Sequence, residues 1–231
     1  MFSTTVTDHW LTAETAPPGE HRVVVDEALP HNRALMVLEP VGLGGILTLS
    51  GALAHRLDLV EGATVDGEAL SDRLAEAGIE LNGADHLFYL PAAEQAALRA
   101  VRTGARELTD ADASAFAVFG ATAPEDDLDE AFVELDHWLV VGTFVDGRLA
   151  CAASMYPWRD TLLADLGVLT LPEFRGRGLA RDTVRAISAL ALERGFEPQY
   201  RCQLDNAASV ALAGSAGFAR FGTWDVIAAE D

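Results

Sequence analysis

Apolar and polar residues in the second half of the chain alternate in blocks that predict strands and helices in a regular order. Residues 138–144 and 149–155 are apolar runs joined by Asp146-Gly147, which predicts a β-hairpin. Residues 162–171 are apolar almost throughout, a pattern typical of a strand buried on both faces. The hairpin and this strand are expected to share one sheet.

A long helix is predicted over residues 178–194, directly after that strand. Its apolar face consists of Ala180, Val184, Ile187 and Ala191. The pattern after it predicts a strand over residues 200–204, a helix over 207–216 and a strand over 219–227. Two helices are expected before the hairpin, over residues 109–119 and 128–135.

The first hundred residues carry a weaker pattern. Residues 22–25 and 34–38 are predicted to form a strand pair, and the glycine-rich stretch 41–45 is predicted to be a flexible loop without a nucleotide-binding signature. The remaining elements expected here are a helix over residues 66–77, a strand over 86–90 and a helix over 91–100.

These elements indicate an α/β (α+β) protein with a central mixed sheet flanked by helices. A boundary is expected at residues 101–105, which divides the chain into a smaller N-terminal α/β domain, residues 1–105, and a second domain, residues 106–231. The N-terminal domain is interpreted as a degenerate copy of the second domain or as a cap that shapes the substrate pocket of the second domain.

Charge narrows the choice of partners. The 231 residues carry 36 acidic and 16 basic side chains, all of the latter arginine, for a formal net charge of -20. Nucleic acid and anionic membranes both require a basic face, so neither is expected as a partner, whereas a cationic ligand suits the chain. Cys151 and Cys202 are expected to be buried, reduced thiols, and no zinc-ligand spacing occurs. Without a leader or membrane span, a cytoplasmic monomer or homodimer is expected.

The arginines gather near one turn. Six of them lie in residues 172–201 against four acidic residues, a local excess of two positive charges. In Arg175-Gly176-Arg177-Gly178-Leu179-Ala180 a strand passes through two glycines into the N-terminus of a helix. Such a helix start binds anions through unpaired N–H groups and the helix dipole. The turn therefore predicts a phosphate site, and a dinucleotide site is excluded because Arg181 stands where a third small residue is needed.

The same turn resembles the R/Q-x-x-G-x-G/A signature of the Gcn5-related N-acetyltransferase (GNAT) superfamily. Downstream, Asn206-Ala207-Ala208-Ser209, followed by Leu212 and Gly217-Phe218, resembles that family's second segment. The resemblance covers residues 106–228 and implies acetyl-CoA as acyl donor. It also implies that strand residues before the turn bind the pantetheine arm through their backbone.

The donor-binding residues that the resemblance and the turn chemistry imply are Leu169, Thr170, Leu171, Arg175, Gly176, Arg177, Gly178, Leu179, Ala180, Asn206 and Ser209. Arg177 alternatively points to solvent. For Asn206 two roles remain open, a contact with pantetheine and an N-cap of the following helix.

Catalytic residues are less well specified. The tyrosine that many family members use as general acid is replaced by Ala213, and the base that the family places on the strand maps near Asp165. Glu134 and Asp136 are the other candidate bases, in an acidic stretch, residues 125–136, that favours a cationic acceptor. No metal is expected.

The resulting hypothesis is a transferase that moves an acetyl group from acetyl-CoA to a primary amine, in a small molecule or a peptide, by direct attack. The alternative is a non-catalytic acyl-CoA-binding or sensing module of the same fold. A third class, a nucleotide-binding protein, would be recognised by stabilisation with ATP or NAD rather than CoA.

Overall fold

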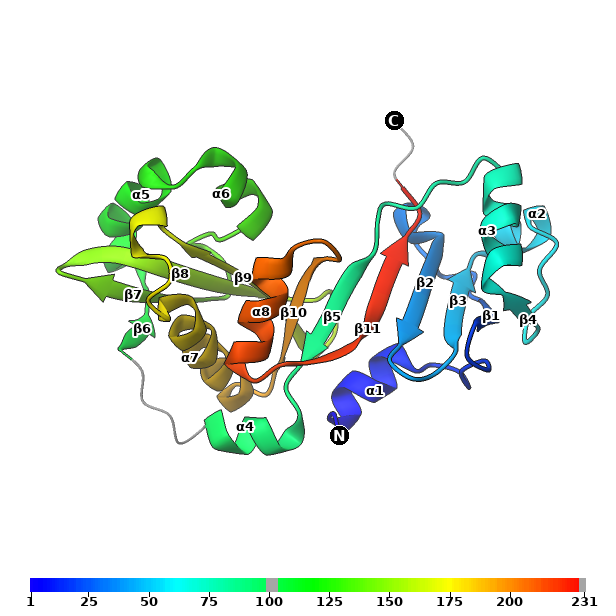
Figure 1. The fold of residues 1–231 in the computed structure, drawn as a ribbon, viewed down its shortest axis with the longest axis horizontal. Coiled ribbons are helices and arrows are strands. Elements are labelled where there is room, and N and C mark those ends of the chain that lie inside the picture. Colours follow the sequence, from blue (N-terminus) through cyan, green and yellow to red (C-terminus); the bar gives the residue numbers. More distant parts are fainter. Residues whose placement is uncertain (99–103, 229–231) are drawn as a thin grey trace. The chain divides into compact units, whose positions relative to one another are not determined.

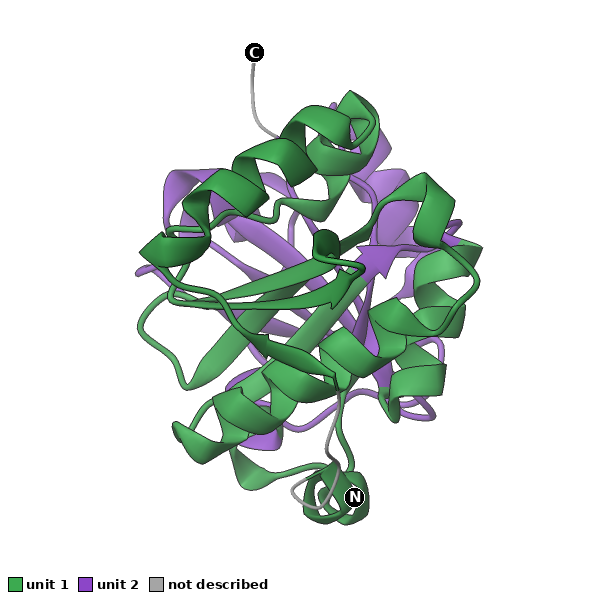
Figure 2. Ribbon diagram, turned by 90° about the vertical axis from the view of Figure 1, so that its left-hand side faces the viewer, with its two compact units in different colours: residues 1–6, 88–201, 207–219 green, residues 7–87, 202–206, 220–231 purple. Residues whose placement is uncertain are grey.

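The computed structural model of the protein describes residues 1–98 and 104–228, which form two compact units (Figure 2). Unit 1 consists of residues 1–6, 88–201 and 207–219. Unit 2 consists of residues 7–87 and 202–206 and the chain from residue 220. Most of the expected boundary at residues 101–105 lies outside the described residues, so the division into residues 1–105 and 106–231 stays a prediction.

Unit 1 contains five neighbouring strands in the order β10-β9-β8-β7-β6. They are β6 (Ala105–Glu107), β7 (Leu139–Val145), β8 (Arg148–Pro157), β9 (Leu163–Thr170) and β10 (Glu197–Gln203). Strands β6 to β9 pair antiparallel and β9 pairs parallel with β10, which makes the sheet mixed. The mixed sheet confirms the predicted fold class.

Helices cover both faces of this sheet (Figure 1). One face carries α5 (Ala113–Thr122) and α6 (Glu125–Ala131), and the other carries α7 (Leu179–Glu193). Beside α7 lie α4 (Ala92–Leu98) and α8 (Ala207–Ala216). Of the predicted apolar face of α7, Val184, Ile187 and Ala191 are buried and Ala180 is half-buried, which explains why this helix forms where it does.

Local signals account for most element ends in unit 1. Asp146 and Gly147 have φ of 50° and 80°, the left-handed values of a tight hairpin turn. Thr109 and Asp112 form a capping box that starts the predicted first helix. The second helix was predicted over residues 128–135, but it starts at Glu125, because Pro124 at the N-cap and three acidic residues in the first turn favour an earlier start.

Unit 2 contains strands in the order β4-β1-β3-β2-β11. They are β1 (Glu20–Val25), β2 (Leu35–Pro40), β3 (Gly45–Leu49), β4 (Thr64–Asp66) and β11 (Ala219–Val226). The predicted pairing of residues 22–25 with 34–38 is wrong, because β3 lies between β1 and β2. The glycine-rich stretch, residues 41–45, forms a short connection between β2 and β3. Strand β3 therefore pairs with β2 directly, and β1 pairs with the other edge of β3.

Two helices cover one face of unit 2, α2 (Gly51–Arg56) and α3 (Gly67–Glu76). Asp66 accepts hydrogen bonds from the N–H groups of Glu68 and Ala69, and Gly78 has φ of 64°, so both predicted ends of α3 are confirmed within a residue. The remaining elements are α1 (Thr4–Trp10), β5 (Asp85–Tyr89) and three 3-10 turns at His31–Arg33, Asp110–Asp112 and Pro172–Phe174. No helix in the described part of the chain is long and apolar enough to cross a membrane.

Candidate functional site

The predicted phosphate-binding turn connects β9 to α7. Gly176 and Gly178 have φ of 73° and 78°, a conformation that glycine adopts without the penalty of a Cβ atom. Gly178 is the N-cap of α7 and carries no capping side chain. The first N–H groups of α7, from Leu179 onward, therefore receive no hydrogen bond from an N-cap side chain, and the Arg181 guanidinium lies close by, 3.6 Å from where a Cβ atom of Gly178 would be.

The three arginines near this turn differ in their contacts. The Arg175 guanidinium lies 2.6 Å from Asp127 of α6, and its Nε–H donates to the Thr170 carbonyl at 3.1 Å. Arg181 pairs with the adjacent Asp182 at 3.0 Å. Arg177 stacks over the Phe174 ring at 5.7 Å and forms no ion pair within the described chain. Arg177 is thus the cation of the turn whose charge is uncompensated.

Strand β9 separates from β10 just before the turn. The parallel ladder runs from Leu163 paired with Glu197 to Leu166 paired with Tyr200 and stops there. Strand β9 continues to Thr170, and over this last stretch it is paired only with β8. The edge of β9 facing away from β8 therefore has backbone groups available where the resemblance predicts pantetheine contacts.

The predicted donor-binding residues on β9 are well anchored. Leu169 and Leu171 are buried in the core cluster under α5 and α6. The Thr170 hydroxyl donates to the Cys151 sulfur at 3.1 Å. Burial raises the pKa of the Cys151 thiol, which suits the inert, reduced cysteine that was predicted. These side chains hold β9 in place and leave contacts with a ligand to its backbone.

The second predicted segment lies at the start of α8. Asn206 directly precedes α8, and its N–H donates to the Gln203 carbonyl at 3.1 Å. Ser209 lies in the first turn of α8 and is half-buried. Neither of the two roles open for Asn206 is decided by these contacts. Ala213 is completely buried, so this position offers neither a hydroxyl nor access to a ligand.

Asp165, the first candidate base, is only 5% exposed and is surrounded by donors. It accepts hydrogen bonds from the Tyr156 hydroxyl at 3.0 Å, from Gln199 Nε2 at 3.0 Å and from the Arg201 guanidinium at 2.7 Å. Gln199 in turn accepts from the Tyr89 hydroxyl. Burial, together with the charge of Asp165, raises the pKa of Tyr156 to about 12. We call Asp165 and the four side chains around it the polar network, which consists of Tyr89, Tyr156, Asp165, Gln199 and Arg201.

A second group of side chains lies next to the polar network. His137 Nδ1 lies 2.8 Å from the Ser154 hydroxyl, and His137 Nε2 lies 3.5 Å from the Glu134 carboxylate. The His137 ring also contacts Phe132 and Tyr156, with ring centroids 5.0 and 5.1 Å apart. Phe132 ends α6 in the left-handed conformation, with φ of 46°. Histidine, carboxylate and aromatic rings thus meet at one place.

Both groups lie on the face of the sheet that α6 covers. Ser154 is paired with Gly167, the first residue of β9 beyond the ladder with β10, and Tyr156 is paired with Asp165. A Cβ atom at position 167 would lie 2.0 Å from the Ala131 carbonyl oxygen, so α6 approaches β9 only because residue 167 is glycine. Paired residues share a face, so His137 and Ser154 lie one strand from the open edge of β9.

Sequence reasoning missed most members of these two groups. It proposed Asp165, Glu134 and Asp136, of which the first two are found here and Asp136 is an exposed residue without an ion pair in the described chain. The missed residues are Tyr89, Phe132, His137, Ser154, Tyr156, Gln199 and Arg201. No short motif links them: the strand register brings Tyr156 and the β10 side chains to Asp165, and the segment after α6 brings Phe132 and His137 to Ser154.

Comparison with known proteins finds similarity in the region that contains the turn. The sequence model of the acetyltransferase (GNAT) family matches residues 105–218. A 55-residue stretch is 38% identical to the uncharacterized N-acetyltransferase YdfB of Bacillus subtilis, and it covers 24% of this chain and 21% of that protein. The chain therefore matches about a fifth of the length of this curated relative.

Solved structures that are similar to this chain match it at low sequence identity. A GNAT-family acetyltransferase from Colwellia psychrerythraea is 19% identical with a TM-score of 0.49, over 64% of this chain and 57% of its own. A GCN5-related N-acetyltransferase from Kribbella flavida is 17% identical with a TM-score of 0.46, over 68% of this chain and 62% of its own.

Proposed function

Because residues 105–218 belong to the GNAT acetyltransferase family, we propose that this chain moves an acetyl group from acetyl-CoA to a primary amine. The observation that carries the proposal is the end of the β9–β10 ladder at Leu166, which leaves the last residues of β9, up to Thr170, unpaired on that edge before the chain reaches the glycine turn into α7. A strand edge with available backbone groups and a helix N-terminus follow each other along one path. An extended arm ending in phosphates fits that path.

The donor would be held mainly by backbone. The pyrophosphate would accept hydrogen bonds from the amides between Arg177 and Ala180, with the uncompensated charge of Arg177 nearby. The pantetheine amides would pair with the edge of β9 from Gly167 to Thr170, as an added strand would, apart from the Thr170 carbonyl, which accepts from Arg175. This fit rests on the chain's own geometry and assigns no side-chain role to the buried Leu169 and Leu171.

The acceptor amine must lose a proton before it attacks. An alkyl ammonium has a pKa of about 10.4, so the free amine at pH 7 costs roughly 4 to 5 kcal/mol. We propose that His137 removes this proton, because imidazole is the side chain most often used as a general base and Glu134 is close enough to stabilise the imidazolium. Ser154 fixes the ring through Nδ1, which leaves the side facing Glu134 for the substrate.

Asp165 stays a candidate base from sequence, but its contacts favour a positioning role. Its oxygens are occupied by Arg201, Gln199 and Tyr156, and the arginine charge balances its own. The polar network would then support the floor of the acceptor site, while Glu134, half-exposed, attracts a cationic acceptor.

The proposal is tested by thiol release from acetyl-CoA in the presence of polyamines, alkyl amines and amino-terminal peptides. Wild-type protein should release thiol in proportion to a preferred amine. His137→Gln should lower kcat/KM by about 100-fold and remove the acidic limb of the pH profile, because general-base catalysis contributes that much. A kcat/KM and pH profile unchanged in His137→Gln would exclude this base.

The alternative is a non-catalytic acyl-CoA-binding or sensing module. It is favoured by the buried Ala213, which leaves no general acid at the family's position, and by the ion pair that occupies Asp165. Saturable acetyl-CoA binding without thiol release for any amine in the panel would support this alternative over acetyl transfer.

A further inference from the structure

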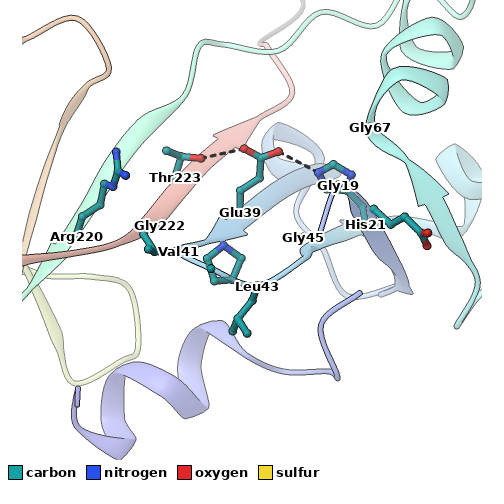
Figure 3. Close-up of a pocket in the computed structure, with 13 residues that line it drawn as sticks. Gly19, His21, Glu39, Val41, Leu43, Gly45, Gly67, Arg220, Gly222 and Thr223 are labelled. Atoms are coloured by element: carbon teal, nitrogen blue, oxygen red, sulfur yellow. Dashed lines mark hydrogen bonds and ion pairs between the residues drawn. The ribbon is translucent and has the colours of Figure 1, made fainter. Parts of the chain in front are cut away.

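Unit 2 contains a cavity of about 530 Å³ that none of the preceding features uses (Figure 3). It is lined by β1, by the loop from β2 to β3, by the start of α3 and by β11, all within this unit. Its volume lies in the range of small-molecule sites. Polar and charged side chains line it together with glycines, so it differs from a gap in an apolar core.

Three polar side chains form a row across the sheet at the base of this cavity. His21 on β1 is paired with Gly45 on β3, and Thr223 on β11 is paired with Glu39 on β2. The pairing of Leu38 with Ile46 places Glu39 beside Gly45. Residues opposite one another on neighbouring strands share a face. His21, Glu39 and Thr223 therefore point to the same side, as Figure 3 shows.

The row depends on the glycine in its middle. The His21 ring reaches across β3, and a Cβ atom at position 45 would lie 2.2 Å from its Cδ2 atom. Any side chain there would separate His21 from Glu39. Gly67 at the start of α3 closes the other side of the ring, where a Cβ atom would be 3.6 Å from Cε1.

Glu39 is held at both carboxylate oxygens and still faces solvent. His21 Nε2–H donates to Oε1 at 3.2 Å, and the Thr223 hydroxyl donates to Oε2 at 3.4 Å. The His21 side chain is 8% exposed, and its Nδ1 has no hydrogen-bond partner within the described chain, whereas the Glu39 side chain is 60% exposed. A surface carboxylate fixed in this way is oriented to bind a cation.

A positive charge lines the same cavity. Arg220 on β11 is exposed and forms no ion pair with any described carboxylate, including Glu39. In Figure 3, Arg220 and His21 lie at opposite ends of the lining, with Glu39 between them. A guanidinium and an oriented carboxylate therefore share one cavity without neutralising each other.

We propose that this cavity binds an α-amino acid with an apolar side chain, its ammonium on Glu39 and its carboxylate on Arg220. A zwitterion satisfies both charges at once, and a guanidinium binds carboxylates through two parallel hydrogen bonds. Val41 and Leu43, in the loop beside the cavity, are 54% and 50% exposed, and they supply apolar contacts for the ligand's side chain.

The test is calorimetric titration of the full chain with L-leucine in the absence of acetyl-CoA, so that acetyl transfer has no part in the result. Wild-type protein should bind L-leucine saturably. Binding of 4-methylpentanoate, which lacks the ammonium, and of 3-methylbutylamine, which lacks the carboxylate, should be at least about tenfold weaker, since each loses one charge-assisted contact.

Variants locate the ligand. Glu39→Gln and Arg220→Gln should each weaken leucine binding by about tenfold or more. Glu80→Gln, an exposed glutamate of the same unit outside the cavity lining, should leave it unchanged. Gly45→Ala should also abolish binding by displacing His21. The proposal is overturned if wild type shows no saturable leucine binding, or if Glu39→Gln and Arg220→Gln bind leucine as tightly as wild type.

Discussion

The turn from Arg175 to Ala180 offers mainly backbone amides, whereas the polar network around Asp165 consists of side chains from four strands. The turn needs little besides glycines at the left-handed positions 176 and 178. The network needs Tyr156, Asp165 and Arg201 in register on β8, β9 and β10. A backbone site is specified by a few consecutive residues, so it is tolerant of its surroundings, while a side-chain site depends on long-range pairing.

The largest expected effect is a loss of acetyl-CoA binding when the backbone site at the turn is changed. Gly178→Glu should weaken acetyl-CoA binding by more than about 100-fold, because it adds left-handed strain and places a carboxylate at the predicted phosphate position. Gly195→Glu is the matched control, since Gly195 has φ of 84° just beyond the other end of α7. Isothermal titration with acetyl-CoA measures both. Equal loss in the two variants would show that strain, not the turn, is responsible.

Substitutions in the polar network should lower the free energy of unfolding. Asp165→Asn leaves the Arg201 charge, whose side chain is 22% exposed, without its partner, and should lower the free energy of unfolding by about 2 to 4 kcal/mol. The double variant Asp165→Asn, Arg201→Gln should recover part of that loss. Urea unfolding measures both. Additive losses would contradict the coupling, and a loss of turnover in folded Asp165→Asn with an altered pH profile would restore Asp165 as the base.

Tyr156 makes the network sensitive to alkaline pH. Its pKa is raised from 10 to about 12, so the folded state holds the phenol proton more tightly than the unfolded chain does. This contribution is complete below pH 10 and is lost as the pH rises from about 10 to about 12. The unfolding free energy of wild type should fall by about 1 to 2 kcal/mol more than that of Tyr156→Phe in this window, given that the phenol is only half-buried.

Chemical denaturation of the two proteins at matched pH values tests this. Parallel curves from pH 9 to pH 12 would mean that Asp165 and burial do not perturb the phenol as the structure indicates.

The smallest expected effect links the turn to the acceptor side. Asp127→Asn frees Arg175 from its ion pair with α6 and should tighten acetyl-CoA binding by about two- to fivefold, because a half-exposed pair contributes under about 1 kcal/mol. Asp129→Asn, an exposed acid of the same helix, controls for the change in net charge. An equal gain in both variants would attribute the effect to general electrostatics.

The difference between the two sites also explains what the sequence could predict. The turn and the helix after it were predicted because strand, glycines and apolar periodicity are local signals. The polar network was not, because Gln199 and Arg201 lie 34 and 36 residues from Asp165 and only the parallel β9–β10 register joins them.

The same distinction holds in unit 2. The helix at Gly67–Glu76 was predicted from its cap and its apolar face. The pairing of β1 with β2 was wrong, because apolar runs do not reveal that β3 lies between them. The cavity above Gly45 followed from that unexpected order, and no motif in the sequence indicates it.

Acetyl transfer itself is tested most directly by measuring both products together. Wild-type protein incubated with acetyl-CoA and a preferred amine should form free CoA and acetylated amine in equal amounts, quantified by thiol titration and mass spectrometry. Gly178→Glu should form neither, and Gly195→Glu should form both. Saturable acetyl-CoA binding with no acetylated product from any amine of the panel would contradict acetyl transfer and leave the chain as a binding module.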